Sequence, residues 1–258
     1  MDERVEVNRR RWAEMAALHE TTYFDGDQAI DDELIPFELE ELGDVTGQRV
    51  CHLQCHIGGN SIALARLGAT VVGVDFSDVA LETARRRAHD AGVDDRVQFV
   101  CSTVDDAVGE TGGDFDGVYT SWGVLTWLPS IETWAAVVRG LLRPGGWLYV
   151  ADTHPYAASA RRPAYPYGGT IGWFDEEQGD YSDLDAQFAN PGEWNWNHGI
   201  GEIVTALARS EMRVEWLHEH PTIAWNLSDD NLVQRADGLW ELPGSTLPLS
   251  FSLRATKA

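Results

Sequence analysis

The chain has 258 residues, of which 43% are hydrophobic and 24% charged, and it carries a formal net charge of -23. This length and composition are typical of one globular domain with its own core, and they exclude collagen-like and disordered chains. The 42 acidic residues outnumber the 19 basic ones. This balance disfavours nucleic acid and acidic lipid surfaces as partners, because both bind basic charge.

Apolar runs stay far below the ~20 residues that cross a bilayer, and the first residues hold no apolar secretory core. We therefore expect a cytoplasmic protein without a membrane partner. Lys257 is the only lysine. An acidic surface with Arg as its basic residue fits a salt-rich cytoplasm, and a codon bias towards Arg explains the missing Lys equally well.

The three cysteines, Cys51, Cys55 and Cys101, do not make a disulfide framework, and we expect reduced thiols. Cys51 and His52 fall in a predicted strand, where neighbouring side chains point to opposite faces. No metal site is therefore expected there. The sequence does not indicate the oligomeric state.

Apolar spacing predicts a helix over 7–18 and a second helical stripe at Ile35, Leu39 and Leu42. From residue 49, short apolar runs alternate with helical patterns. The predicted helices are Asn60–Leu67, Ser77 or Asp78 to about Ala91, Ile131–Leu142 and Glu202–Arg209. The predicted strands are Arg49–Leu53, Thr70–Asp75, Arg96–Cys101, Phe115–Thr120, Trp147–Ala151 (after a turn at Arg143–Gly146), Arg213–His218 and Leu247–Thr256.

This order predicts an α/β fold: a doubly wound, Rossmann-like sheet of seven strands, mostly parallel, with an antiparallel last strand. Residues 1–45 form a predicted N-terminal helical cap, and residues 46–258 form the core of what is overall a single domain. An insertion over 154–198 is rich in Pro, Gly, Tyr and Trp. Long connections of this kind are typically lids or binding loops.

Ligands of such sheets bind beyond the carboxyl ends of the strands, near the first strand-to-helix turn. Here that turn runs from Gln54 to Asn60 and contains Gly58 and Gly59, which let backbone approach a ligand. Asp75 ends the second predicted strand, where a carboxylate can accept both hydroxyl hydrogens of a ribose. The alternative interpretations are that Gly58 and Gly59 only form a tight turn and that Asp75 only caps a helix. Ser77 and Asp78, however, already suit the role of the cap.

The chain resembles the class I S-adenosylmethionine-dependent methyltransferases of the small-molecule type. The segments that carry the resemblance are, in order, VCHLQCHIGGNSIALARLGATVVGVDFS, RVQFVCSTVDD, FDGVYTSWGVLTWL, LLRPGGWLYVAD and LPLSFSLRAT. The family's turn is acid-x-Gly-x-Gly-x-Gly, whereas this chain has His52, Gln54, His56 and Gly58. Because His56 disfavours a positive φ, we expect the turn to depart from the family's geometry, with Gln54 and His56 donating hydrogen bonds to the cofactor's carboxylate.

The resemblance implies S-adenosyl-L-methionine as cofactor, with Asp75 on the ribose hydroxyls and Phe76 against the adenine. Thr103 stands where many relatives have an adenine-binding Asp, beside the Val104 amide. The methionyl part would face the turn residues Gln54, His56, Gly58 and Asn60. Ser121 and Trp122 would border the sulfonium, and Trp12 and Tyr23 of the cap would close the pocket.

Methyl transfer from a sulfonium is an in-line displacement that depends on alignment, and an aromatic face such as that of Trp122 can orient the cation. His154, directly after the fifth strand, is the first candidate base, and His198 is the second. Both are also candidates for scaffold roles. The aromatic insertion favours an apolar, ring-containing small molecule as acceptor.

The sequence therefore predicts methyl transfer to an oxygen or nitrogen of a small molecule. One alternative is a protein that binds S-adenosylmethionine or S-adenosylhomocysteine without turnover. Another is an NAD-dependent oxidoreductase, although Gln54 and His56 stand where a dinucleotide fingerprint needs glycine.

Overall fold

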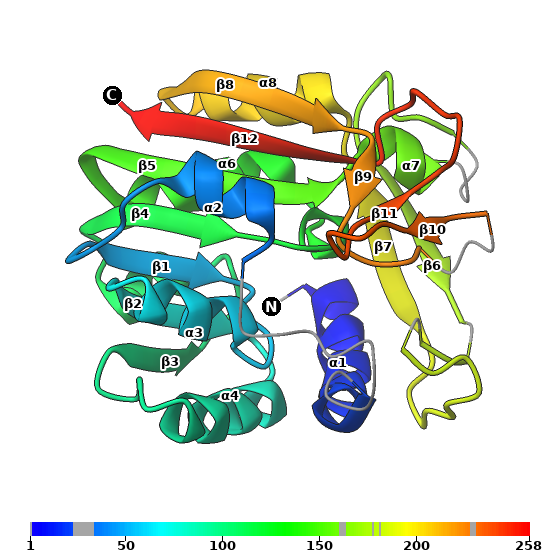
Figure 1. Cartoon of the computed structure of the whole chain (residues 1–258), viewed down its shortest axis with the longest axis horizontal. Coiled ribbons are helices and arrows are strands. Elements are labelled where there is room, and N and C mark those ends of the chain that lie inside the picture. Colours follow the sequence, from blue (N-terminus) through cyan, green and yellow to red (C-terminus); the bar gives the residue numbers. More distant parts are fainter. Residues whose placement is uncertain (1, 23–33, 160–163, 177, 181, 228–230) are drawn as a thin grey trace.

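The computed structural model describes residues 2–22, 34–159, 164–176, 178–180, 182–227 and 231–258. Seven strands form one sheet in the order β3-β2-β1-β4-β5-β12-β8, and β12 runs antiparallel to both of its neighbours, β5 and β8 (Figure 1). This arrangement confirms the predicted fold. The strands are β1 (Arg49–Leu53), β2 (Thr70–Asp75), β3 (Val97–Cys101), β4 (Phe115–Thr120), β5 (Leu142–Thr153), β8 (Met212–His220) and β12 (Ser250–Lys257).

The sheet is buried between two layers of helices, which is why its central strands consist of nearly continuous apolar runs. One face packs on α5, α6 and α8, and the opposite face packs on α2, α3 and α4. The helices are α1 (Glu3–Thr22), α2 (Pro36–Leu42), α3 (Gly59–Arg66), α4 (Asp78–Asp90), α5 (Ala107–Thr111), α6 (Ile131–Leu141), α7 (Pro155–Ser159), α8 (Ile200–Arg209) and the short 3-10 helix η2 (Leu125–Trp127).

Local signals set several helix ends. The Ser77 hydroxyl accepts a hydrogen bond from the Ala80 amide at 3.2 Å and caps α4, and Gly92, with a φ of 67°, follows that helix. Residues 143–146 are counted in β5, yet they form the predicted turn as an irregularity within that strand, since Gly145 has a φ of 75°. The register between β4 and β5 shifts there, because Phe115 pairs with Leu142 while Gly117 pairs with Trp147.

Two segments lie beside the carboxyl ends of the strands. The insertion contains α7 and a hairpin of β6 (Ile171–Asp175) and β7 (Glu193–Asn197). A second extension, which the sequence did not predict, follows β8 and forms a small sheet of β9 (Thr222–Ile223), β10 (Val233–Gln234) and β11 (Trp240–Glu241). Ile223, Leu232 and Leu249 of this extension pack with Ala157 of the insertion, so the two segments share a core.

In the described ranges, no helix is long and apolar enough to cross a membrane. The same residues contain no group of three or more His, Cys, Asp or Glu side chains that could hold a metal ion.

Candidate functional site at the carboxyl ends of the strands

The turn after β1 has the left-handed backbone that its glycine-poor sequence disfavours. Gln54 has a φ of 56°, His56 of 48° and Gly58 of 82°. The expectation that His56 disfavours a positive φ here is therefore wrong, because the two bulky residues adopt the conformation that glycine would supply. The His56 amide donates a hydrogen bond to Asp75 Oδ2 at 2.9 Å, and this bond helps to hold the turn.

Asp75 lies at the end of β2, beside that turn, and is only 7% exposed. Its Oδ1 accepts a hydrogen bond from the Ser77 amide at 2.9 Å. Burial raises the pKa of Asp75 to about 6, against the opposing effect of these backbone hydrogen bonds. Each carboxylate oxygen keeps a second lone pair, so Asp75 can accept further hydrogen bonds from a ligand.

Helix α1 lies over the turn and the start of α4 (Figure 1). Its Ala16 packs against Ile57 and Ala80, and all three are buried. The Trp12 ring meets the rings of His56 and Trp127 edge-on, with centroids 5.2 and 5.1 Å apart. Tyr23, the other predicted cap residue, lies outside the described residues.

A chain of hydrogen bonds joins the insertion, α1 and the turn. His19 Nε2 lies 2.8 Å from Asp180 Oδ1, and His19 Nδ1 lies 2.9 Å from His56 Nε2. Burial alone would raise the pKa of Asp180, but hydrogen bonds from His19 and Ser182 outweigh it and lower that pKa. Because an ionised carboxylate only accepts, His19 Nε2 carries a hydrogen and donates it to Asp180. Burial, with His19 nearby, lowers the pKa of His56 well below its usual value.

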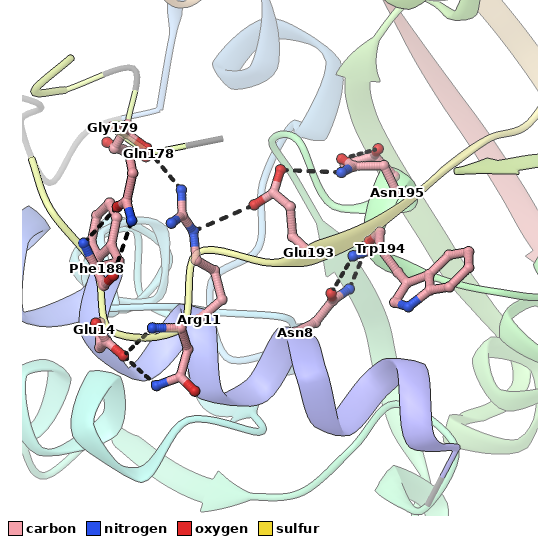
Figure 2. Close-up of polar contacts among 12 residues, drawn as sticks. Asn8, Arg11, Glu14, Gln178, Gly179, Phe188, Glu193, Trp194 and Asn195 are labelled. Carbon is pink, nitrogen blue, oxygen red and sulfur yellow. Dashed lines mark hydrogen bonds and ion pairs between the residues drawn. The ribbon is translucent and has the colours of Figure 1, made fainter. Parts of the chain in front are cut away.

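Figure 2 shows further polar contacts between α1 and the insertion. Asn8 donates from Nδ2 to the Trp194 carbonyl at 2.8 Å and accepts from the Trp194 amide at 2.7 Å. The buried Arg11 guanidinium donates to the Gly179 carbonyl at 2.8 Å, lies 3.6 Å from a Glu193 oxygen and covers the Phe188 ring. Polar side chains therefore connect the two segments.

The end of β4 brings Ser121 and Trp122 beside the turn. Asn60 Nδ2 donates to Ser121 Oγ at 3.1 Å, and Gln54 Nε2 donates to the Val124 carbonyl at 3.0 Å. The buried Asp152 carboxylate accepts from the amides of residues 123–125 and so fixes the loop that leads into η2.

The residues predicted on the adenine side lie after β2 and β3. Phe76 is half-buried, and Val104 is buried in the main core. The Thr103 hydroxyl donates to Asp106 Oδ2 at 2.9 Å. This bond engages Thr103 with the start of α5.

Comparisons with known proteins show which proteins the chain resembles. Residues 50–146 match the family described as a methyltransferase domain. Ubiquinone biosynthesis O-methyltransferase of Bordetella avium (strain 197N) is 30% identical over 112 residues, which make up 43% of this chain and 45% of that protein. Demethylmenaquinone methyltransferase of Clavibacter sepedonicus is 37% identical over 108 residues, 42% of each chain. The chain therefore spans less than half the length of these curated relatives.

Solved structures share the fold over a larger part of the chain. An S-adenosylmethionine-dependent methyltransferase from Mesorhizobium loti has a TM-score of 0.61 at 21% identity and covers 86% of this chain and 96% of its own. A glycopeptide N-methyltransferase solved with S-adenosyl-L-methionine has a TM-score of 0.58 at 18% identity, with 86% and 92% covered. Residues 50–146 therefore match a methyltransferase domain, and the chain shares the fold of S-adenosylmethionine-dependent methyltransferases.

The structure places His154, the first candidate base, between β8 and α7. Its Nδ1 accepts a hydrogen bond from the Tyr156 amide at 3.0 Å, and its Nε2 lies 3.0 Å from Glu219 Oε1. Burial lowers the pKa of His154, against the opposing effect of Glu219. Both ring nitrogens are thus engaged within the protein.

His198, the second candidate, is the last residue of the insertion and lies beside the end of η2. Its Nε2 donates to the Leu128 carbonyl at 2.9 Å, and its Nδ1 lies 2.9 Å from the Thr170 hydroxyl. Burial lowers its pKa too. Neither histidine has a hydrogen bond to Ser121 or Trp122 among the contacts of the described residues.

Three residues of the candidate site are missing from the sequence predictions. His19 lies on the α1 face of Trp12 and Ala16, and this helical spacing could have indicated it. Asp180 and Glu38 had no such signal. Glu38 is 1% exposed and contacts Tyr119, 81 residues away along the chain.

Proposed function

We propose that the protein transfers a methyl group from S-adenosylmethionine to an oxygen or nitrogen of a small, ring-containing molecule. The observation that carries this proposal is the conformation of the turn after β1 beside Asp75, within the segment that matches the methyltransferase family. The curated relatives have names that refer to quinones, which supports a ring-containing acceptor.

Buried polar atoms without a partner support a cofactor at this place. Gln54 Oε1 and Trp12 Nε1 are buried and have no hydrogen-bond partner among the residues that the structure describes. Such groups cost about 1–3 kcal/mol each unless water or a ligand satisfies them. The amide oxygen can accept from the cofactor's ammonium group, and the indole can donate to its carboxylate, so these residues fit the amino-acid part of the cofactor.

The cofactor supplies an electrophilic methyl group, and this chain's residues would hold and align the reactants. Asp75 would accept from the ribose hydroxyls, with Phe76 and the Val104 amide on the adenine side. Trp122 packs edge-on against Phe37 and Trp225, with centroids 5.9 and 5.6 Å apart. Flat, apolar acceptors suit these aromatic walls.

Calorimetry with S-adenosylhomocysteine, followed by turnover with a panel of phenols, quinols and aromatic amines, tests the proposal. We expect binding, and methylation of at least one ring-containing compound. Binding without any turnover would favour a non-catalytic binding protein. Thermal stabilisation by NAD and none by S-adenosylhomocysteine would favour an oxidoreductase.

A further inference from the structure

A file of hydrogen bonds, in which each side chain donates to the next, runs from Ser121 after β4 through Tyr119 to the buried carboxylate of Glu38 on α2. Ser121 Oγ donates to the Tyr119 hydroxyl at 2.6 Å, and the Tyr119 hydroxyl donates to Glu38 Oε1 at 2.6 Å. Asn60 Nδ2 donates to both hydroxyl oxygens, at 2.6 Å to Tyr119 and 3.1 Å to Ser121.

The donors and acceptors fix the direction of this file. An ionised Glu38 can only accept, so Tyr119 uses its single hydrogen on the carboxylate. Ser121 must then donate to Tyr119. The Ser121 oxygen keeps a lone pair at the edge of the sheet, and each hydrogen bond points towards Glu38.

Glu38 is well placed to hold a proton at the end of the file. The contacts of the described residues give it no cationic partner, and its Oε2 accepts only the Ile35 amide, at 3.2 Å. Burial raises the pKa of Glu38 to about 7, while the hydrogen bond from Tyr119 opposes this effect. A carboxyl group with such a pKa exchanges its proton near neutral pH.

Other polar and titratable groups surround the file. Glu41, on α2, adds to the rise in the pKa of Glu38 but binds Tyr149 and His218 itself. The rings of Tyr149 and His52 pack on Tyr119, at 5.7 and 5.1 Å between centroids. His220 of β8 stacks on Phe37, the α2 residue next to Glu38. The Trp122 indole lies close enough to Glu38 to favour its charged form, although Nε1 lacks hydrogen-bond geometry to an acceptor.

We propose that Ser121, Tyr119 and Glu38 form a proton relay that takes the proton from the methyl acceptor. This inference rests on the proposed function. The acceptor's O–H or N–H proton passes to Ser121 Oγ, the Ser121 proton passes to Tyr119, and the Tyr119 proton passes to Glu38. The acceptor atom bonds to the methyl carbon with the electron pair that its proton leaves, and the pair of the broken carbon–sulfur bond neutralises the sulfonium. One carboxylate becomes one carboxylic acid, so charge and protons balance.

Two variants and one control test the relay. Glu38→Gln keeps an oxygen that accepts from Tyr119 but removes the proton acceptor, and Tyr119→Phe interrupts the file. Glu41→Gln is the matched control, because Glu41 is a largely buried carboxylate on the same helix that takes its hydrogen bonds outside the file.

We expect kcat to fall roughly a hundredfold in both relay variants, as for the loss of a general base, with KM and affinity for S-adenosylhomocysteine within about threefold of wild type. The limb of the wild-type kcat–pH profile near pH 7 should disappear in Glu38→Gln and remain in Glu41→Gln. A protonated-carboxyl infrared band with a midpoint near pH 7 should appear in the wild type and be absent only in Glu38→Gln, whereas the band of Asp75, whose pKa is about 6, should appear in every variant. The infrared measurement requires no turnover.

The relay is overturned if kcat in the relay variants equals that of the wild type, or if Glu38→Gln shows the same carboxyl band. The proposed function stays intact in either case, provided that the cofactor still binds. Wild-type protein that does not bind S-adenosylhomocysteine overturns the proposed function, and the relay with it.

Discussion

Asn8 of α1 and Trp194 of β7, 186 positions apart in the chain, are joined by two hydrogen bonds. The side-chain amide of Asn8 bonds to both the backbone amide and the backbone carbonyl of Trp194. Asn8 is 1% exposed, so its removal leaves the Trp194 amide and carbonyl without their partner. The pair belongs to the polar contacts that join the helical cap to the insertion.

We predict that Asn8→Ala lowers the free energy of unfolding by about 1–3 kcal/mol, the cost of unsatisfied buried groups. Urea unfolding would measure this loss, and hydrogen exchange should increase at 193–197. Glu14→Ala is a suitable control, because Glu14 binds the Ala189 and Asn190 amides at an exposed position. A larger loss in the control would contradict the importance of the buried pair.

Asp75→Ala should weaken the binding of S-adenosylhomocysteine by ~1.5–3 kcal/mol, because charged hydrogen bonds to the ribose are lost. Isothermal titration calorimetry would measure the change. Asp78→Asn, an exposed acid at the start of α4, should leave the affinity unchanged. Equal affinities in Asp75→Ala and wild type would remove Asp75 from the cofactor site.

His154→Ala separates a base from a positioning residue. A base would show a loss of roughly a hundredfold in turnover at unchanged cofactor affinity. Since Tyr156 and Glu219 engage the two ring nitrogens, we expect a loss below tenfold together with a lower melting temperature. Steady-state kinetics and thermal unfolding of the same sample distinguish the two results.

Glu38 should make the folded protein less stable as pH rises. Its pKa is 4.5 in the unfolded chain and about 7 in the folded protein, so between these values only the folded state keeps the proton. Raising the pH across this window therefore lowers the free energy of unfolding, by up to ~3 kcal/mol. Glu38→Gln lacks this contribution.

Urea unfolding at pH 5, 6, 7 and 8 would measure this contribution. The free energy of unfolding of Glu38→Gln, relative to that of the wild type, should increase with pH. A difference that stays constant across these pH values would mean that Glu38 keeps its ordinary pKa.

Much of the sheet could be predicted from local sequence, since apolar runs such as Thr70–Asp75 and capping residues such as Ser77 act over a few positions. The backbone conformation of Gln54 and His56 could not be predicted from local sequence. Tertiary contacts such as the hydrogen bond to Asp75 stabilise a conformation that their side chains disfavour. The extension after β8 also escaped prediction, since its two-residue strands are too short to show a period.

The contacts between α1 and the insertion are largely polar, as Asn8, Arg11 and His19 illustrate. Water can replace a hydrogen bond partner at small net cost, whereas an apolar seam resists wetting. Separating α1 from the insertion would therefore expose mostly groups that water can hydrogen-bond.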